Sequence, residues 1–204
     1  MGRTPEEKKN TPGSDGEVSL RQSFLLYLHD LIYVIAVLMI LFILFFRIVT
    51  VSGPSMNSTL WDGDWLLVMA RTPFLEPKQG DIVISSKQSF NDGEPIIKRV
   101  IATEKQTVDI DFSSGIVYVD GEALDEPYTF SPTNLDEGVS FPLVVEENCF
   151  FVMGDNRNHS NDSRNPVIGL IDRREIVGKA LFLVFPGTDG NIMSRNFDRI
   201  GALS

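Results

Sequence analysis

The chain has 204 residues, a formal net charge of −10 and 43% hydrophobic residues. A nucleic-acid-binding protein needs a basic surface that releases phosphate counterions, so this acidic balance argues against nucleic acid as a partner. The single cysteine, Cys149, excludes an intramolecular disulfide and a thiolate zinc cluster, and its apolar neighbours are typical of a buried strand. The two histidines, His29 and His159, do not suggest a metal pair, and we predict no metal and no cofactor.

The chain divides into a tail, an anchor and a folded domain. Residues 1–22 are rich in Gly, Pro, Thr, Glu and Lys without apolar periodicity, which is typical of a disordered tail. Residues 31–46 carry no charge, and the apolar character resumes after Arg47, so the segment approaches the ~20 residues that cross a bilayer. We therefore predict a cytoplasmic tail, a transmembrane anchor over residues 23–49 and one domain over residues 50–204.

Two alternatives for the apolar segment are less well supported. A buried core helix would not need to be so uniformly apolar, and a cleaved signal peptide would have a shorter core and a small-x-small site after it. Arg47 is the only basic residue that closely follows the segment. The basic residues that precede it are Arg3, Lys8, Lys9 and Arg21. Because basic segments stay on the cytoplasmic side, we expect a single-pass cell-membrane protein with its N-terminus in the cytoplasm and its domain outside.

The rest of the chain is predicted to form short strands separated by turns. Gly-Asp pairs precede apolar runs, and an Asp-Gly pair after GIVYV is a hairpin signal. The predicted strand segments are 61–68, 79–85, 96–103, 115–121, 149–153 and 180–185. Residues 125–143, with three prolines, are predicted to be irregular, and residues 187–204 to form a short helix or a frayed end. The fold class is therefore mostly β, an all-β domain that follows one N-terminal transmembrane helix.

Ser55 is the first candidate catalytic residue. It lies in SGPSMNSTL, residues 52–60, where Gly53 and Pro54 interrupt the backbone just ahead of it. Taken alone, this pattern equally describes an ordinary turn serine. A serine becomes a nucleophile only when a base activates it, so the function depends on whether the chain offers one.

The run PIIKRVIA, residues 95–102, contains a candidate base. In a strand, Lys98 shares a face with Ile96 and Arg99 lies on the opposite face, so one charge points toward apolar surroundings. The alternative is an edge strand that carries protective charges. Burial lowers the pKa of a lysine, and a lysine near neutrality acts as a general base, whereas an arginine stays charged. Lys98 is therefore the candidate base, because a Ser–Lys pair is a known variant of the Ser–His–Asp arrangement.

The loop GDNRNHSNDSR, residues 154–164, follows a predicted strand. Its composition is also typical of a solvated surface loop. However, its many polar side chains can form hydrogen bonds with the loop's own backbone and so fix its conformation. Asp162 and Arg164 are expected to form a charge-assisted pair. His159 leaves a second catalytic arrangement open, a triad of Ser55 and His159 with Asp155 or Asp162.

Together these stretches resemble type I signal peptidase, a membrane-bound Ser–Lys protease that cuts signal peptides from exported proteins. The family's serine box, Ser/Asp-Gly-x-Ser-Met-x-Pro-Thr-Leu, matches residues 52–60 except that Ser58 replaces the proline. Its lysine box, Lys-Arg-Val/Ala, matches residues 98–100, and its last box matches residues 154–164 at every fixed position. The Gly-x-Pro-Gly-Asp turn that is common after the lysine box is replaced by residues 102–106. The short chain is similar to the Gram-positive-type members.

The resemblance implies roles for individual residues. Ser55 would be the nucleophile and Lys98 the general base, and the Ser55 backbone N–H would stabilise the oxyanion. The supporting residues that it implies are Ser160, which would orient the Lys98 amine, Asp162 and Arg164 as an ion pair, and Asp155, which would shape the same loop. Some members add a hydroxyl to the oxyanion hole two positions before the nucleophile, where this chain has Gly53.

The resemblance also implies the substrate, an exported preprotein with small residues one and three positions before the cut. We expect the signal-peptide region to add as a strand beside two segments, with backbone pairing for affinity and shallow pockets for specificity. The residues expected to bind it are Thr50, Val51, Ser52, Gly53, Pro54, Pro95, Ile96 and Ile97. The lipid bilayer is the second expected partner.

Two other functions are compatible with parts of the sequence. A membrane-anchored β domain that only binds a partner gives no reason for a lysine among isoleucines. A Ser–Lys self-cleaving regulator needs no membrane anchor. The Asn-x-Ser/Thr sites at Asn57, Asn158 and Asn161 lie in the predicted catalytic loops, where glycans would block access, so we give them no weight.

Overall fold

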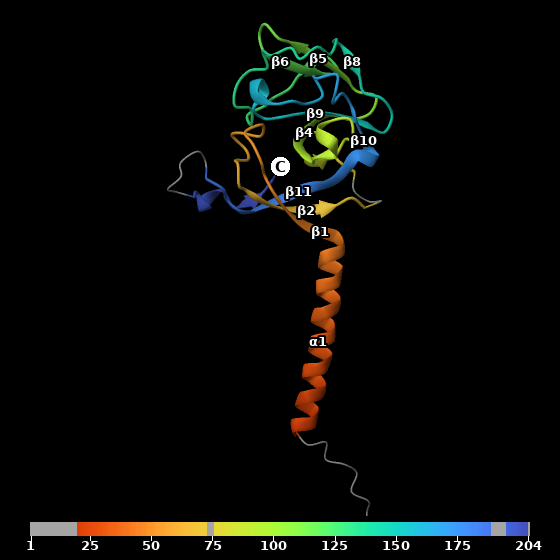
Figure 1. Ribbon diagram of the computed structural model, residues 1–204, viewed down its shortest axis with the longest axis vertical. Coiled ribbons are helices and arrows are strands. Elements are labelled where there is room, and N and C mark those ends of the chain that lie inside the picture. Colours follow the sequence, from red (N-terminus) through yellow and green to blue (C-terminus); the bar gives the residue numbers. More distant parts are fainter. Residues whose placement is uncertain (1–19, 73–75, 189–194, 204) are drawn as a thin grey trace, which may run out of the picture. The chain divides into compact units, whose positions relative to one another are not determined.

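The computed structural model describes residues 20–72, 76–188 and 195–203 (Figure 1). The chain divides into two compact units, Met1–Phe42 and Ile43–Ser204. Most of the predicted tail, residues 1–19, lies outside the described residues.

One helix, α1, forms the described part of the first unit and runs on to Phe45. It spans Leu20–Phe45, and its segment Ser23–Phe45 has a mean hydropathy of 2.6, so it is long and apolar enough to cross a membrane. The predicted boundary at residue 49 is wrong for the helix, because Phe46–Thr50 forms strand β1. Its β-branched residues suit a strand, and its backbone pairs in register with β2, Trp65–Ala70.

Two antiparallel sheets form the folded domain. The larger sheet has the order β1-β2-β11-β3-β4-β9-β10, with β12 paired to β11, and the smaller has the order β7-β6-β5-β8. The remaining strands of the larger sheet are β3 (Ile82–Ser85), β4 (Ile96–Ala102), β9 (Cys149–Met153), β10 (Ile171–Asp172), β11 (Ile176–Phe185) and β12 (Gly201–Ala202). Those of the smaller sheet are β5 (Thr107–Asp111), β6 (Ile116–Val119), β7 (Glu122–Ala123) and β8 (Leu143–Val144). Strands β4 and β9 lie between the smaller sheet and strands β2 and β11 (Figure 1).

Each predicted strand segment contains at least part of an observed strand, and the mostly β fold class is confirmed. The predicted hairpin is also present, because β6 and β7 pair across a turn in which Asp120 and Gly121 both have positive φ angles, 53° and 84°. The irregular segment is confirmed from Leu124 to Pro142. In residues 187–204, predicted as a short helix or a frayed end, the described part forms a single 3₁₀ turn, Phe197–Arg199, followed by β12, and residues 189–194 lie outside the described residues. The other 3₁₀ turns are Asn91–Gly93, Arg157–His159 and Arg173–Glu175.

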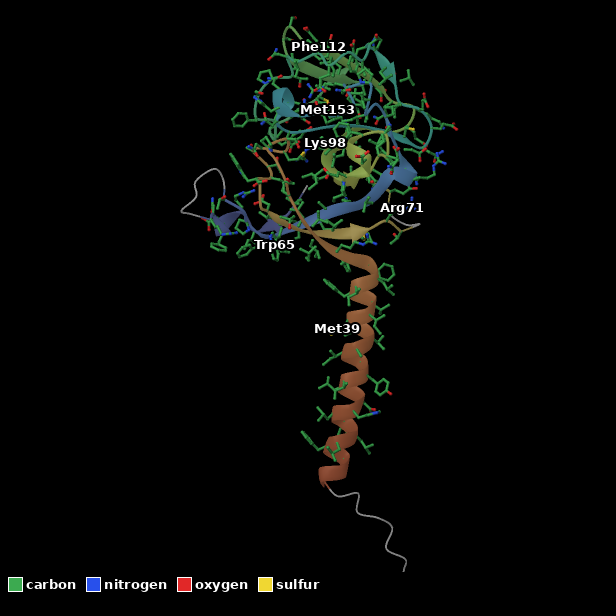
Figure 2. The ribbon with its side chains drawn as sticks, viewed as in Figure 1. Met39, Trp65, Arg71, Lys98, Phe112 and Met153 are labelled. Carbon is green, nitrogen blue, oxygen red and sulfur yellow. The ribbon has the colours of Figure 1, made fainter. Side chains whose placement is uncertain are left out.

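Three apolar clusters form the core of the domain. The first joins the loop after β1 to the larger sheet, because Met56 and Leu60 are fully buried against residues such as Leu66 and Ile82. The second lies between the two sheets, and the third covers the other face of β4 and β9. Figure 2 shows Lys98 and Met153 among these strands. The first cluster matters for the site, since it holds the residues on either side of Ser55 in place.

Candidate active site

Ser55 and Lys98 meet in the structure although 43 positions separate them. Lys98 Nζ lies 2.9 Å from Ser55 Oγ, within hydrogen-bond distance. Lys98 is 4% exposed and Ser55 is half-buried. Burial lowers the pKa of Lys98 from 10.5 to about 8, and three nearby carboxylates partly oppose this shift. The carboxylates belong to Asp162, Asp155 and Glu137. A lysine with this pKa is substantially neutral near pH 8, so it can accept a proton from the serine.

Strand β4 is central from Arg99 onward, and the edge-strand interpretation of its charges is wrong because both charged side chains are buried. Its neighbours are β3, where Val83 lies opposite Lys98, and β9, where Met153 lies opposite Arg99. Both charged side chains are buried, and the strand therefore carries two buried cations rather than one. The sequence pattern could show that a charge faced apolar residues, but it could not show that the strand was covered on both faces.

The loop that carries Ser55 is held by its own backbone and by the core. Val51 N donates to Asp64 O and Gly63 N donates to Val51 O, which closes the base of the loop. Gly53 has a φ of 86°, a conformation that favours glycine, and its N–H donates to Asp62 Oδ1 over 2.8 Å. Within the part of the chain that the structure describes, the backbone N–H of Ser55 makes no hydrogen bond.

The loop of residues 154–164 packs directly on the Ser55 loop. Asn156 N donates to Ser55 O over 3.0 Å, and its side-chain amide donates to Pro54 O over 3.1 Å. Gly154 lies so close that a Cβ atom there would be 2.4 Å from Ser55 O and 2.3 Å from Ser160 Oγ. Only glycine fits this position, which sequence analysis did not single out.

Two buried arginine–aspartate pairs support this loop. The Arg164 guanidinium donates from Nε to Asp162 Oδ1 over 2.8 Å and from Nη2 to Asp162 Oδ2 over 2.9 Å, as predicted for this pair. The Arg99 guanidinium binds Asp155 in the same bidentate way, over 2.9 Å and 2.8 Å. The second pair was missed, although both residues belong to quoted motifs, because a partner 56 positions away leaves no local pattern.

Ser160 does not make the predicted hydrogen bond to Lys98. Its side chain is buried, and its Oγ has no hydrogen-bond partner among the described residues. Ser160 is nevertheless a near neighbour of Gly154, and through it of the Ser55 carbonyl. Its role in orienting the lysine therefore stays a prediction.

The alternative triad is not assembled in this structure. The side chain of His159 is exposed. The two aspartates that could have oriented it, Asp155 and Asp162, are each bound by a buried arginine. Neither carboxylate is free to hold an imidazole beside Ser55, so the geometry favours the lysine as the base.

A cavity of about 400 Å³ opens beside the Ser55–Lys98 pair. The predicted substrate-binding residues that line it are Thr50, Val51, Ser52, Pro95, Ile96 and Ile97. Gly53 and Pro54 are not among its lining residues, and their role in substrate binding stays a prediction. The lining residues that sequence analysis missed are Val49, Met56 and Glu94.

The strand pairing leaves two backbone edges available at this cavity. Within the described part of the chain, β1 pairs only with β2, and β9 pairs with β4 only from Arg99 onward, opposite Met153. Residues 96–98 of β4 therefore pair with β3 alone. An extended peptide could pair with either free edge and pass the Ser55 hydroxyl.

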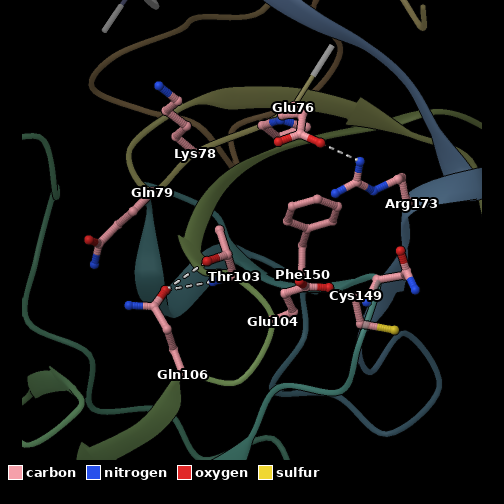
Figure 3. Close-up of a pocket in the computed structure, with 11 residues that line it drawn as sticks. Glu76, Lys78, Gln79, Thr103, Glu104, Gln106, Cys149, Phe150 and Arg173 are labelled. Carbon is pink, nitrogen blue, oxygen red and sulfur yellow. Dashed lines mark hydrogen bonds and ion pairs between the residues drawn. The ribbon is translucent and has the colours of Figure 1, made fainter. Parts of the chain in front are cut away.

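A second cavity of similar volume has no comparable chemistry. Two pairs of its charged and polar residues bind each other, since Arg173 donates to Glu76 over 3.0 Å and Gln106 accepts from Thr103 (Figure 3). It contains Cys149 but none of the predicted catalytic residues. The Ser55–Lys98 cavity is therefore the candidate active site.

A serine hydroxyl beside a buried lysine, in a cavity lined by strand residues, is the arrangement of a serine peptidase of the Ser–Lys type. The chain matches the family "signal peptidase, peptidase S26" over residues 25–185, and it belongs to this family.

Its curated relatives agree with the family. It is 40% identical over 146 residues to "Probable signal peptidase I-1" of Synechocystis, with 68% of this chain and 70% of the relative covered. It is 38% identical over 163 residues to "Signal peptidase I T" of Bacillus subtilis, with coverage of 75% and 82%. It is 37% identical over 144 residues to "Signal peptidase I" of Bacillus licheniformis, with coverage of 67% and 75%.

Proposed function

We propose that this protein is a signal peptidase that removes N-terminal signal peptides from exported preproteins, with Ser55 as nucleophile and Lys98 as general base. The observation that carries the assignment of these two residues is the 2.9 Å approach of Lys98 Nζ to Ser55 Oγ, at a lysine whose pKa burial lowers to about 8. The family membership supplies the reaction, the hydrolysis of a peptide bond.

The acylation step follows from this geometry. Neutral Lys98 takes the proton of the Ser55 hydroxyl as Oγ attacks the scissile carbonyl, and the resulting oxyanion accepts a hydrogen bond from the Ser55 N–H. That N–H is available because no other group binds it among the described residues. The lysine ammonium then gives its proton to the departing amine, which leaves an ester on Ser55.

Hydrolysis of the ester uses Lys98 as the base a second time. Lys98 takes a proton from water as the water oxygen attacks the ester carbonyl, and the ammonium returns the proton to Ser55 Oγ as the acid product leaves. The arginine–aspartate pairs take no part in proton transfer. They hold in place the loop of residues 154–164, which contacts the Ser55 carbonyl.

The substrate is proposed to bind as an extended strand in the 400 Å³ cavity, with small residues one and three positions before the cut. The free edges of β1 and of residues 96–98 support this mode of binding, and the cavity has an apolar lining that includes Val51, Met56 and Ile97. Gly53 and Pro54 would shape the serine loop rather than line the cavity.

The membrane topology is a further part of the proposal. Residues 23–45 would cross the cell membrane once, with residues 1–22 in the cytoplasm and the folded domain outside. The apolar composition of Ser23–Phe45 and the basic residues before it support this orientation. Protease added to intact cells should digest the domain and spare an epitope at the N-terminus, and the opposite pattern would contradict the orientation.

The catalytic assignment is tested with the full chain in detergent and a preprotein substrate. Ser55→Ala and Lys98→Ala should each abolish cleavage, while far-ultraviolet circular dichroism and thermal unfolding show that the variants fold. His159→Ala is the matched control and should retain near-normal activity, because its side chain is exposed and unconnected to the pair. Cleavage by the Lys98→Ala variant, or inactivity of His159→Ala, would contradict the Ser–Lys assignment.

A further inference from the structure

Asp64 closes the far end of the loop that carries Ser55. Its carboxylate is 0% exposed and accepts hydrogen bonds on both oxygens. One comes from Trp61 N within the loop, over 2.8 Å, and one from Gly187 N, over 2.6 Å. Two more come from Arg199, from Nη1 to Oδ1 over 3.0 Å and from Nη2 to Oδ2 over 2.6 Å. Residues near the C-terminus, which no catalytic motif includes, therefore hold the end of this loop.

Arg199 contacts the loop at a second point. Its Nη2 also donates to Thr59 O over 3.1 Å, so one guanidinium bridges Thr59 and Asp64. The planar guanidinium suits a bidentate contact with a carboxylate, and such charge-assisted hydrogen bonds are stronger than neutral ones. The side chain of Arg199 is only 17% exposed, so water screens this ion pair less than it screens a surface pair.

The C-terminal segment is itself packed on the domain, which holds Arg199 in place. The turn Phe197–Arg199 precedes β12, and β12 pairs with β11. After β12, Leu203 N donates to Leu181 O over 3.0 Å. The Leu203 side chain packs against the first apolar cluster, which also contains Met56 from the Ser55 loop.

The Ser55 loop is thus held at two ends by different parts of the chain. Near Ser55 it is contacted by the loop of residues 154–164. At its far end it is bound by Arg199, and the stretch between these ends is a short turn in which Leu60 N donates to Met56 O over 2.9 Å. A restraint on the far end is therefore carried over a few residues of backbone to the Ser55 hydroxyl.

We propose that Arg199 is a positioning residue for the reaction, which holds the loop at Thr59 and Asp64 and so sets the Ser55 hydroxyl against Lys98. The inference rests on the proposed function, because it presupposes that Ser55 is the nucleophile. Arg199 lies beyond residue 185, where the match to the family ends, so its role is particular to the C-terminal segment of this chain.

The test is the measurement of kcat and KM for Arg199→Gln in the full chain in detergent, with a preprotein substrate, at a temperature below the unfolding transition of the variant. Glutamine cannot bridge the two loop positions, and a displacement of the reacting atoms by a fraction of 1 Å to 1 Å should lower kcat by about 10- to 100-fold. KM should change much less, because Thr59, Asp64 and Arg199 do not line the cavity. Arg199→Lys keeps the charge but not the bidentate geometry, so it should recover part of the lost kcat.

Rescue by a small cation separates positioning from overall stability. Methylguanidinium at millimolar concentration, added to Arg199→Ala, should restore part of kcat because it can donate to the same carboxylate and carbonyl. The same addition should not raise the kcat of the unmodified protein.

Lys87→Gln is the matched control. Lys87 is also a partly buried cation that binds a loop, since its Nζ donates to Leu170 O over 2.8 Å and lies 4.0 Å from Glu175 Oε2, but these partners lie outside the Ser55 loop. This control variant should lower the free energy of unfolding and leave kcat unchanged. The inference is overturned if Arg199→Gln loses stability in the same way but keeps its kcat. It is also overturned if neither the lysine variant nor methylguanidinium restores kcat. Activity of Ser55→Ala would instead overturn the proposed function.

Discussion

Arg99 and Asp155 form a bidentate ion pair with both side chains essentially excluded from solvent, at 1% and 0% exposure. The pair joins the central strand β4 to the loop that packs on Ser55. Arg99 also lies over the ring of Tyr128, 4.0 Å from its centroid. The residue after the candidate base is thus a structural link between the strand and the loop that support the site.

Loss of one partner should be costly because it leaves a buried charge without its counter-charge. We expect Asp155→Ala to lower the free energy of unfolding by about 3–5 kcal/mol, measured by denaturant unfolding of the full chain in detergent. Replacement of both partners, Arg99→Met with Asp155→Leu, should recover most of that loss. Glu147→Ala, which breaks the exposed Lys105–Glu147 pair, is the control and should cost no more than about 1 kcal/mol. If Asp155→Ala and Glu147→Ala lowered the free energy of unfolding by similar amounts, burial of the Arg99–Asp155 pair would not be the cause of the loss.

The activity should depend on the protonation of Lys98. The lysine must be neutral to accept the proton of Ser55, and its pKa is lowered to about 8. We expect kcat/KM to rise about tenfold per pH unit below pH 8 and to level off above it. A flat profile between pH 6 and pH 9, measured at constant ionic strength with the same preprotein, would mean that Lys98 is not the base.

Burial of Lys98 should also reduce the stability of the fold near neutral pH. The folded-state pKa of about 8 is below the unfolded value of 10.5, so between these values the folded protein binds fewer protons than the unfolded chain. Stability due to this residue therefore rises as the pH increases from about 8 to 10.5, and below pH 8 the full cost, about 3 kcal/mol, is present.

Lys98→Met removes this cost and should be inactive but more stable than the unmodified protein at pH 7, by up to about 3 kcal/mol. The gain should shrink as the pH approaches 10, because the lysine is then neutral in the folded state as well. Denaturant unfolding at pH 7 and pH 10 checks both statements. A variant that is less stable at pH 7 would show that the ammonium stabilises the fold.

Gly154 should tolerate no side chain, because a Cβ atom would lie 2.4 Å from Ser55 O. In Gly154→Ala we expect the two loops to separate and the Ser55 hydroxyl to shift relative to Lys98. A displacement of about 1 Å at reacting atoms lowers the rate by about 100-fold, so kcat should fall by that order. Gly121→Ala is the control, since its Cβ would meet no atom within 4 Å. It should lower the free energy of unfolding, because a φ of 84° disfavours a side chain, and it should leave kcat unchanged. An unchanged kcat in Gly154→Ala would contradict the role of the contact.

Much of the fold could be predicted because its signals are local. The apolar composition of residues 31–46, the Asp120–Gly121 turn and the Gly-Asp starts of β2 and β3 depend on neighbouring residues. Strands β1, β5, β8, β10 and β12 were missed. The last three have only two residues each and exist through their partners. Helix α1 ends four residues before the predicted end of the anchor, because Ile48 and Val49 are equally suited to a membrane helix and to a strand.

The sequence by itself determined the candidate residues of the site, because serine, lysine and the polar loop carry a recognisable order of residue types. Only the tertiary structure decided how they work together. It buried the side chain of Lys98, so that the lysine is desolvated, and it brought Asp155 to Arg99 and Glu137 to Arg164. The physical reason is that desolvation and ion pairing depend on distances in space, which side chains far apart in the chain acquire only when the strands pack.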